Sequence, residues 1–411
     1  MTVWRQLKSQ RKKLQMKQAD VCHGLCSVSY YSKIENGRVI PEENLAAALG
    51  ERLQLTEGTS TKYSNSNLAE WLLLHTTLLS EEEPSTTPSA SQADGREETA
   101  LLFVLKLREL LKKPYAADAA WKLYNQAECE HPSDSRVRFL LHKARGVLYY
   151  AEGWPEHASR SLLQAYCAAA ETQPAVDEMI DLHLYAALTM LESENEESAY
   201  FHAAACVRLA AETGDVKSCT KAMEAGAEAL LYAGLKEEAE RDLLLLQQNI
   251  TGESGERTSL MRGKYYRQRG QSAEAASMLQ KSYRSRDGMD RLEVIYELVH
   301  VFMEMGMYED ARTWTAHAQT TIAEFESNHP LSSRDTGWKH LFTFLSSCCS
   351  QSIDETKEIV LQILPYFETR VQWRHCRYFY NWLAEHALSK QDVKGGLYWR
   401  TKAGNRLLPS S

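Results

Sequence analysis

The sequence of 411 residues predicts an all-α fold, in which a small N-terminal group of helices precedes a long array of antiparallel helix pairs. Apolar residues recur at helical spacing through most of the chain. Small residues recur with a period of roughly 36–43 residues, as they do where the helices of a repeat array touch. We find no alternating run of β-branched residues between turn residues that would predict a strand.

Composition excludes several classes of protein. Hydrophobic residues make up 44% and charged residues 25% of the chain, the balance of an ordinary soluble globular protein. No apolar run approaches the ~18 residues that cross a bilayer, and no apolar stretch follows the basic N-terminus to form a secretory signal. The nine scattered cysteines are a poor disulfide framework. We therefore expect reduced thiols, a cytoplasmic location and no membrane partner.

Charge is concentrated at one end of the chain. Residues 1–40 carry eight basic and two acidic side chains, a net charge of +6. Because the net charge of the whole chain is −8, the rest of the chain has a net charge of −14. A basic module on an acidic body favours a polyanion as the partner of the module alone. The alternative is a lysine-rich helix face that is simply solvated.

The first sixty residues have the pattern of a helix-turn-helix. Apolar spacing predicts a first helix ending near Gln15 and a short second helix over Asp20–Leu25, with Val21 and Cys22 facing inward. Ser27 is a suitable N-cap for a third helix that ends at Glu35. A fourth helix after Pro41 carries Leu45, Leu49 and Leu53.

The run from Gly24 to Gly37, GLCSVSYYSKIENG, resembles the recognition helix of Cro/repressor-type (XRE) domains, and more closely that of the peptide-sensing bacterial regulators grouped as RRNPP. Two residues depart from the pattern: Lys17 replaces a Ser/Thr cap and Tyr31 replaces a core aliphatic residue. The resemblance implies that Arg11 and Glu35 form a structural ion pair between the first and third helices.

A helix-turn-helix places the start of its third helix in a major groove, while the second helix and nearby basic residues hold phosphates. The predicted DNA-binding residues are Lys17, Gln18, Val28, Ser29, Tyr30 and Lys33. For these residues the alternative is an exposed helix face. Because each chain carries one recognition helix, we expect a homodimer on an inverted repeat in a double-stranded DNA operator.

Three segments are predicted, with boundaries at 1–60, 61–98 and 99–411. The middle segment contains a helix that opens at Asn67 with a capping box, followed by residues 81–98, which hold no aromatic or branched aliphatic side chain. Such a segment cannot offset its ordering entropy, which predicts a mobile linker.

The last segment has the small-residue pattern of tetratricopeptide repeats, which stack into a right-handed superhelix with a concave face. A clear copy reads Gly263, Tyr266, Gly270 and Ala275, and a weak one lies between Trp338 and Phe367. We interpret the chain from Gly146 to Ala403 as seven such copies, some of them weak, and residues 99–130 as a helix pair that caps the array.

With the array included, the resemblance to the RRNPP group extends over almost the whole chain. It implies a cytoplasmic transcription regulator whose repeat domain binds a short signalling peptide that controls DNA binding, as in quorum sensing. The alternative is a repeat domain that binds a protein, such as a response regulator, without a peptide. No phosphate-binding glycine loop and no zinc-protease motif is present, so we expect no enzyme, no metal and no cofactor.

The register of the tetratricopeptide motif predicts which residues line the concave face. They are Lys143, Tyr150, His183, Glu224, Glu228, Arg257, Lys264, Arg267, Tyr296, His300, Lys339, Tyr378, Asn381 and Glu385. The basic cluster of Arg257, Lys264 and Arg267 has the chemistry to hold a peptide carboxylate, and Asn381 to pair with a peptide backbone. The alternative is salt bridges between neighbouring helices, for instance between Glu228 and Arg267.

Overall fold

The computed structural model describes residues 14–35, 117–129, 134–249, 258–350 and 353–404, together with positions 11–12, 45, 48–49, 52–53, 102–104, 106–107 and 110. These residues form helices and their connections, with no strand among them. The predicted all-α fold is confirmed. The predicted helix at Asn67, the linker 81–98 and Arg257 lie outside the described residues.

Two short helices, α2 (Gln18–Cys22) and α3 (Val28–Glu35), form the N-terminal turn. Helix α2 starts and ends earlier than the predicted range. It starts earlier because the Asp20 carboxylate accepts the backbone N–H of Lys17 at 2.9 Å, and the chain leaves the helix before Gly24, whose φ is 72°. The predicted cap of α3 is confirmed, since Ser27 Oγ accepts the backbone N–H of Tyr30 at 3.2 Å.

Seven helix pairs follow in the described part of the chain, at the seven predicted positions, after the single helix α7 (Ala117–Cys129). They are α8 (Ser135–Ala151) with α9 (Pro155–Thr172), α10 (Val176–Glu192) with α11 (Glu196–Thr213), α12 (Val216–Tyr232) with α13 (Lys236–Asn249), α14 (Thr258–Gln268) with α15 (Ser272–Arg284), α16 (Leu292–Glu304) with α17 (Tyr308–Asn328), α18 (Ser333–Cys349) with α19 (Ile353–Thr369), and α20 (Trp373–Ser389) with α21 (Val393–Gly404).

Glycine allows the two helices of a pair to approach closely. A Cβ atom on Gly146 would lie 2.6 Å from Leu162 Cγ of the partner helix, and one on Gly263 would lie 2.5 Å from Leu279 Cγ. Alanines fully removed from solvent, such as Ala275, occupy facing positions on the second helices. The small residues therefore have the role that the repeat pattern predicts for them.

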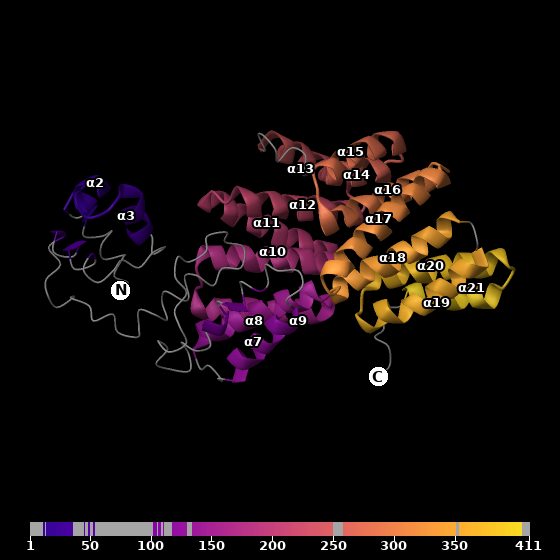
Figure 1. Cartoon of the computed structure of the whole chain (residues 1–411), viewed down its shortest axis with the longest axis horizontal. Helices are drawn as coiled ribbons and strands as arrows, with labels where there is room; N and C mark the ends of the chain where they lie inside the picture. Colours follow the sequence, from indigo (N-terminus) through magenta and orange to yellow (C-terminus); the bar gives the residue numbers. More distant parts are fainter. Residues whose placement is uncertain are drawn as a thin grey trace.

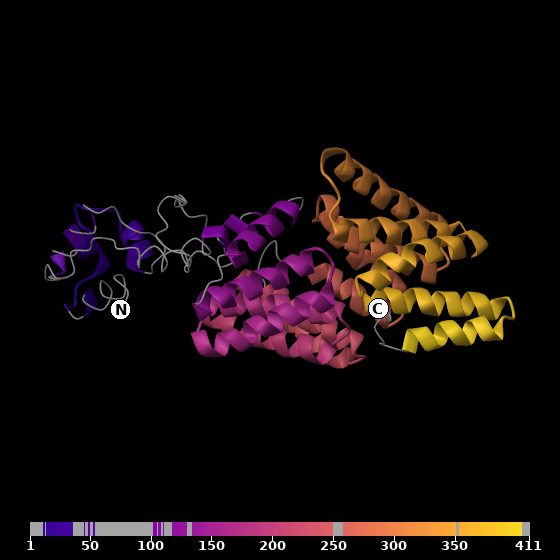
Figure 2. The ribbon, with the colours of Figure 1, turned by 90° about the horizontal axis from the view of Figure 1, so that it is seen from below.

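The pairs stack in chain order and curve, so that the last two pairs return to the side of the first two (Figures 1 and 2). Hydrogen bonds join these ends: Gln372 Nε2, at the start of α20, donates to the carbonyl of Gly153, in the turn between α8 and α9, at 2.7 Å. Successive first helices, from α8 to α18, lie against one another along the curve.

The described helices include none with the length and apolar character needed to cross a lipid bilayer. All nine cysteines are described, and each is free rather than disulfide-bonded. No group of three or more potential metal ligands occurs in the part of the chain that the structure describes.

Candidate DNA-binding and ligand-binding sites

Helix α3 has one face in the core and one in solvent. Tyr31 and Ile34 pack with Leu49 and Leu53 and are removed from solvent. On the other face lie the predicted DNA-reading residues: Val28 is 46% exposed, Ser29 and Lys33 are exposed, and Tyr30 is half-buried. The start of α3 therefore presents short polar and apolar side chains with a cation one turn further on.

An ion pair attaches the first helix to α3. Arg11 Nε and Nη2 donate to the two carboxylate oxygens of Glu35, and Arg11 Nη1 donates to the carbonyl of Met16 at 2.9 Å. The ion pair expected from the resemblance is confirmed. Burial alone would raise the pKa of Glu35, but hydrogen bonds from Arg11 and Gln18 hold this pKa below its usual value.

Lys17 and Gln18 differ in where they point. Lys17 is exposed, whereas Gln18 Nε2 donates to Glu35 Oε2 at 2.7 Å. In this conformation the Gln18 amide supports the ion pair, and its contact with a phosphate stays a prediction.

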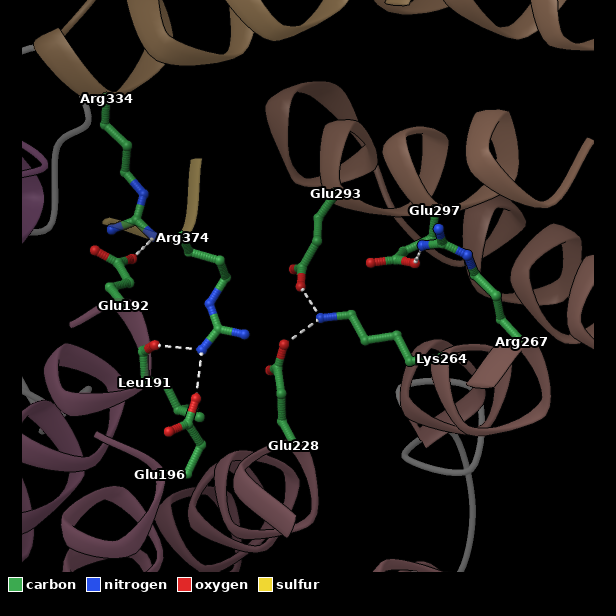
Figure 3. Close-up of polar contacts among 10 residues, drawn as sticks. All are labelled: Leu191, Glu192, Glu196, Glu228, Lys264, Arg267, Glu293, Glu297, Arg334 and Arg374. Atoms are coloured by element: carbon green, nitrogen blue, oxygen red, sulfur yellow. Dashed lines mark hydrogen bonds and ion pairs between the residues drawn. The ribbon is translucent and has the colours of Figure 1, made fainter. Parts of the chain in front are cut away.

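Polar residues from three consecutive first helices meet on the concave side of the array. We call this set the inner face: Glu228 on α12, Lys264 and Arg267 on α14, and Glu293 and Glu297 on α16 (Figure 3). Lys264 Nζ lies 2.6 Å from both Glu228 Oε1 and Glu293 Oε1. Burial opposes the charge of Lys264, but the two carboxylates hold its pKa well above the ordinary value.

Arg267 is bound in the same way, one turn along α14. Its Nη1 lies 2.8 Å from Glu297 Oε2, and its Nη2 lies 2.7 Å from Glu304 Oε1. Glu228 pairs with Lys264 and not with Arg267, because Arg267 extends toward α16. Both cations therefore form salt bridges between neighbouring first helices. Such salt bridges were the alternative to a ligand-binding role in the sequence analysis.

The inner face is partly buried and partly exposed. The side chain of Lys264 is only 8% exposed, whereas that of Glu293 is 42% exposed. Burial nevertheless opposes ionisation of Glu293, and Lys264 lowers its pKa below the usual value. These carboxylates are accessible to a ligand and are already bound to internal cations.

Aromatic rings continue the inner face toward α20. The rings of Tyr296 and His300 meet edge to face, with their centres 4.5 Å apart, and the centre of the His300 ring lies 5.7 Å from that of the Tyr378 ring. Burial lowers the pKa of His300 to about 3, with a further contribution from Arg267, so this ring is neutral at physiological pH. Asn381 lies half-buried one turn beyond Tyr378 on α20.

Other residues predicted to line the concave face contact neighbouring helices instead. Lys143 is 1% exposed and pairs with Glu178 and Asp181 of α10. His183 Nδ1 lies 3.0 Å from His202 Nδ1, between α10 and α11. The remaining contacts are Lys339 with Glu326, Glu385 with Arg400, and Tyr150 with Arg334 and Tyr185, while Glu224 is half-buried on α12.

Sequence analysis missed the carboxylates that hold the central cations. Glu293 lies three residues before Tyr296, Glu297 lies three residues before His300, and Glu304 lies four residues after His300. These spacings place side chains on the same side of one helix, so helical periodicity alone was a sufficient signal. Arg334 and Arg374 were missed for another reason. Their partners lie more than 140 residues away, and no local pattern indicates such a pairing.

The N-terminal part of the chain matches a known protein family. Residues 7–58 match the family described as Helix-turn-helix. No curated protein matches the sequence.

Solved structures resemble the chain as a whole. The quorum sensor NprR in complex with its cognate peptide NprX has a TM-score of 0.64 at 15% identity, over 83% of this chain and 98% of that one. The apo form of NprR from B. thuringiensis has a TM-score of 0.54 at 16% identity, over 75% and 88%. A Rap protein complexed with competence and sporulation factor has a TM-score of 0.62 at 11% identity, over 95% and 98%.

At these identities the likeness to NprR and Rap is one of fold. The resemblance drawn from the sequence is confirmed for both parts: the chain joins a segment of the helix-turn-helix family to a helical-repeat array with the fold of the RRNPP proteins NprR and Rap.

Proposed function

We propose that this protein is a cytoplasmic, DNA-binding transcription regulator whose repeat array binds a short signalling peptide that controls DNA binding. One observation carries the proposal. A helix-turn-helix segment and a repeat fold occur in one chain, and the similar structures of NprR and Rap hold the peptide NprX and competence and sporulation factor.

For DNA, we propose a homodimer that places one α3 helix in each half-site of an inverted repeat. The exposed face of α3 supports this assignment, because Val28, Ser29 and Lys33 are exposed. Lys17, Tyr30 and Gln18 complete the proposed contact surface. Residues 1–60 would form this domain and residues 61–98 the connection to the array.

For the peptide, we propose the inner face and the adjoining aromatic residues. Glu228, Lys264 and Arg267 present both charges on one surface, so an acidic group on a peptide gains a cation only by displacing an internal carboxylate. Tyr296, His300 and Asn381 extend this surface with rings and an amide. Lys143 and His183, which are engaged between helices, contribute to shape rather than to direct contact.

The experiment is mass spectrometry of peptides retained when the full chain is purified from its native host. We expect a retained peptide, and we expect Lys264→Met to lower its amount at least about tenfold, the loss expected for removing a paired, buried cation. Arg241→Met is the matched control, because Arg241 is 70% exposed on the outer helix α13. If a second protein is retained and no peptide is found, the result would contradict the proposal and favour a repeat domain that binds a protein partner.

A further inference from the structure

The two ends of the described array are joined across the concave side by polar contacts between residues far apart in sequence. We call these contacts the latch. On one side are Arg334, Gln372, Arg374 and Arg377, at the starts of α18 and α20. On the other side are Tyr150 at the end of α8 and Gly153 in the turn after it. Beside them lie Leu191 and Glu192 at the end of α10, Glu194 in the next turn and Glu196 at the start of α11.

Arg334 makes the most contacts in the latch. Its guanidinium pairs with Glu192, donates to the carbonyl of Tyr150 at 3.3 Å, and lies 4.6 Å from the centre of the Tyr150 ring. Burial opposes the charge on Arg334, yet Glu192 and Tyr150 hold its pKa above the ordinary value. A single side chain of α18 therefore holds the ends of α8 and α10.

The start of α20 adds three residues. Arg374 Nη2 donates to the carbonyl of Leu191 at 2.8 Å and lies 3.2 Å from Glu196 Oε1 (Figure 3). Arg377 Nη2 lies 2.6 Å from Glu194 Oε2. With the bond from Gln372 to Gly153, α20 holds both turns of the opposite end.

The latch has no apolar core among the described residues. One buried cluster spans Leu102–Ala186 and another spans Leu260–Leu383, and no described cluster contains residues from both. Closure therefore depends on ion pairs, hydrogen bonds to carbonyls and stacking of arginine on aromatic rings. The ion pairs of the latch are partly exposed, and such pairs are individually weak, so the contacts can break without opening a hydrophobic core.

The latch lies beside the inner face. The guanidinium of Arg374 is 3.5 Å from the centre of the Tyr232 ring at the end of α12, one turn from Glu228. We propose that the latch is a reversible conformational switch: the array exists in a closed form with the ends joined and an open form with the ends apart, and opening widens access to the inner face. The switch is a property of the chain itself and does not require a peptide ligand.

The test is small-angle X-ray scattering of the full chain. Arg334→Gln combined with Arg374→Gln removes two cations from the latch. The matched control, Arg241→Gln with Arg312→Gln, removes two cations from within-helix pairs on the outer helices α13 and α17. We expect a larger radius of gyration for the latch variant only. Unchanged scattering of the latch variant would overturn the proposal.

A second arm covers failure of the latch variant to fold, which far-UV circular dichroism would reveal. The unmodified chain is measured at low salt and at 1 M salt, where the screening length falls to about 3 Å. Expansion at high salt with full helicity supports the latch, and identical scattering at both salt concentrations overturns it. Neither arm uses a peptide, so the latch and the proposed function stand or fall separately.

Discussion

At the scale of single residues, the buried carboxylate of Glu35 depends on its partners. Its side chain is fully removed from solvent, and that of Arg11 is 14% exposed. Arg11→Ala leaves this charge without its ion-pair partner, which typically costs about 3–5 kcal/mol. We expect thermal melts of the isolated segment 1–60, or hydrogen exchange of α3 in the full chain, to show loss of the N-terminal domain. Lys12→Ala, at the exposed neighbouring position, should leave it folded.

The same carboxylate predicts acid sensitivity. Because the pKa of Glu35 is lower in the folded chain than its usual value of 4.5, the stabilisation is present above that value and is lost as pH falls below it. Hydrogen exchange of α3 measured from pH 6 downward should show this loss. Glu35→Gln should remove the pH dependence, and a retained slope in that variant would contradict the assignment.

Lys33 tests the DNA-reading face. If its ammonium contacts a base, Lys33→Ala should cost about 1–3 kcal/mol on the selected operator and relax sequence preference. Lys12→Ala, on the first helix, should instead lower affinity for all sequences and flatten the salt dependence. Fluorescence anisotropy with operator and scrambled duplexes separates the two patterns. Equal losses on both duplexes for Lys33→Ala would assign it to phosphate contact.

At the scale of elements, close packing within a helix pair distinguishes two glycines. Gly263→Ala places a Cβ 2.5 Å from Leu279 Cγ, and overpacking of this kind costs about 1–3 kcal/mol. Gly226→Ala on α12 meets Ala203 Cβ at 3.4 Å, an ordinary contact, and gains up to about 1 kcal/mol of helix propensity. Urea melts should therefore shift in opposite directions. A stabilising Gly263→Ala would contradict the close approach of α14 and α15.

The histidine pair between α10 and α11 predicts a second pH dependence. Burial, together with His202 and Arg208, lowers the pKa of His183 to about 4. The unfolded chain therefore takes up a proton at a pH where the folded chain does not, and stability falls as pH drops from about 6.5 toward 4. By pH 5 the loss is about 2 kcal/mol. His183→Asn should reduce this slope in urea melts, while the control His317→Asn, at an exposed position on α17, should not.

Local patterns predicted local structure well. The cap at Ser27, the inward positions of Val21 and Cys22, and the small residues of each helix pair are short-range features, and the structure confirms them. The start of α2 was predicted less accurately, because it depends on one hydrogen bond that the backbone N–H of Lys17 donates to the Asp20 carboxylate.

At the scale of the whole molecule, prediction was weaker for physical reasons. The repeat register placed Lys264 and Arg267 on the first helices, but their charges are balanced by glutamates of neighbouring pairs. Arg334 reaches Glu192 only because the helix pairs from α10 to α18 curve back toward their start. Contacts of that kind depend on the accumulated geometry of the stack and leave no signal in a short stretch of sequence.

In the proposed function, binding of a peptide at the array changes the binding of DNA. The most direct measurement is the anisotropy of an operator duplex, selected from a random library by the full chain, with and without the low-molecular-mass peptide fraction of the host's spent medium. We expect the fraction to change the Kd for operator by about 5–150-fold, the usual range of coupling between sites. We also expect Lys264→Met to abolish the change. The same Kd with and without the fraction, in a chain that binds its operator, would contradict coupling between the array and the DNA-binding domain.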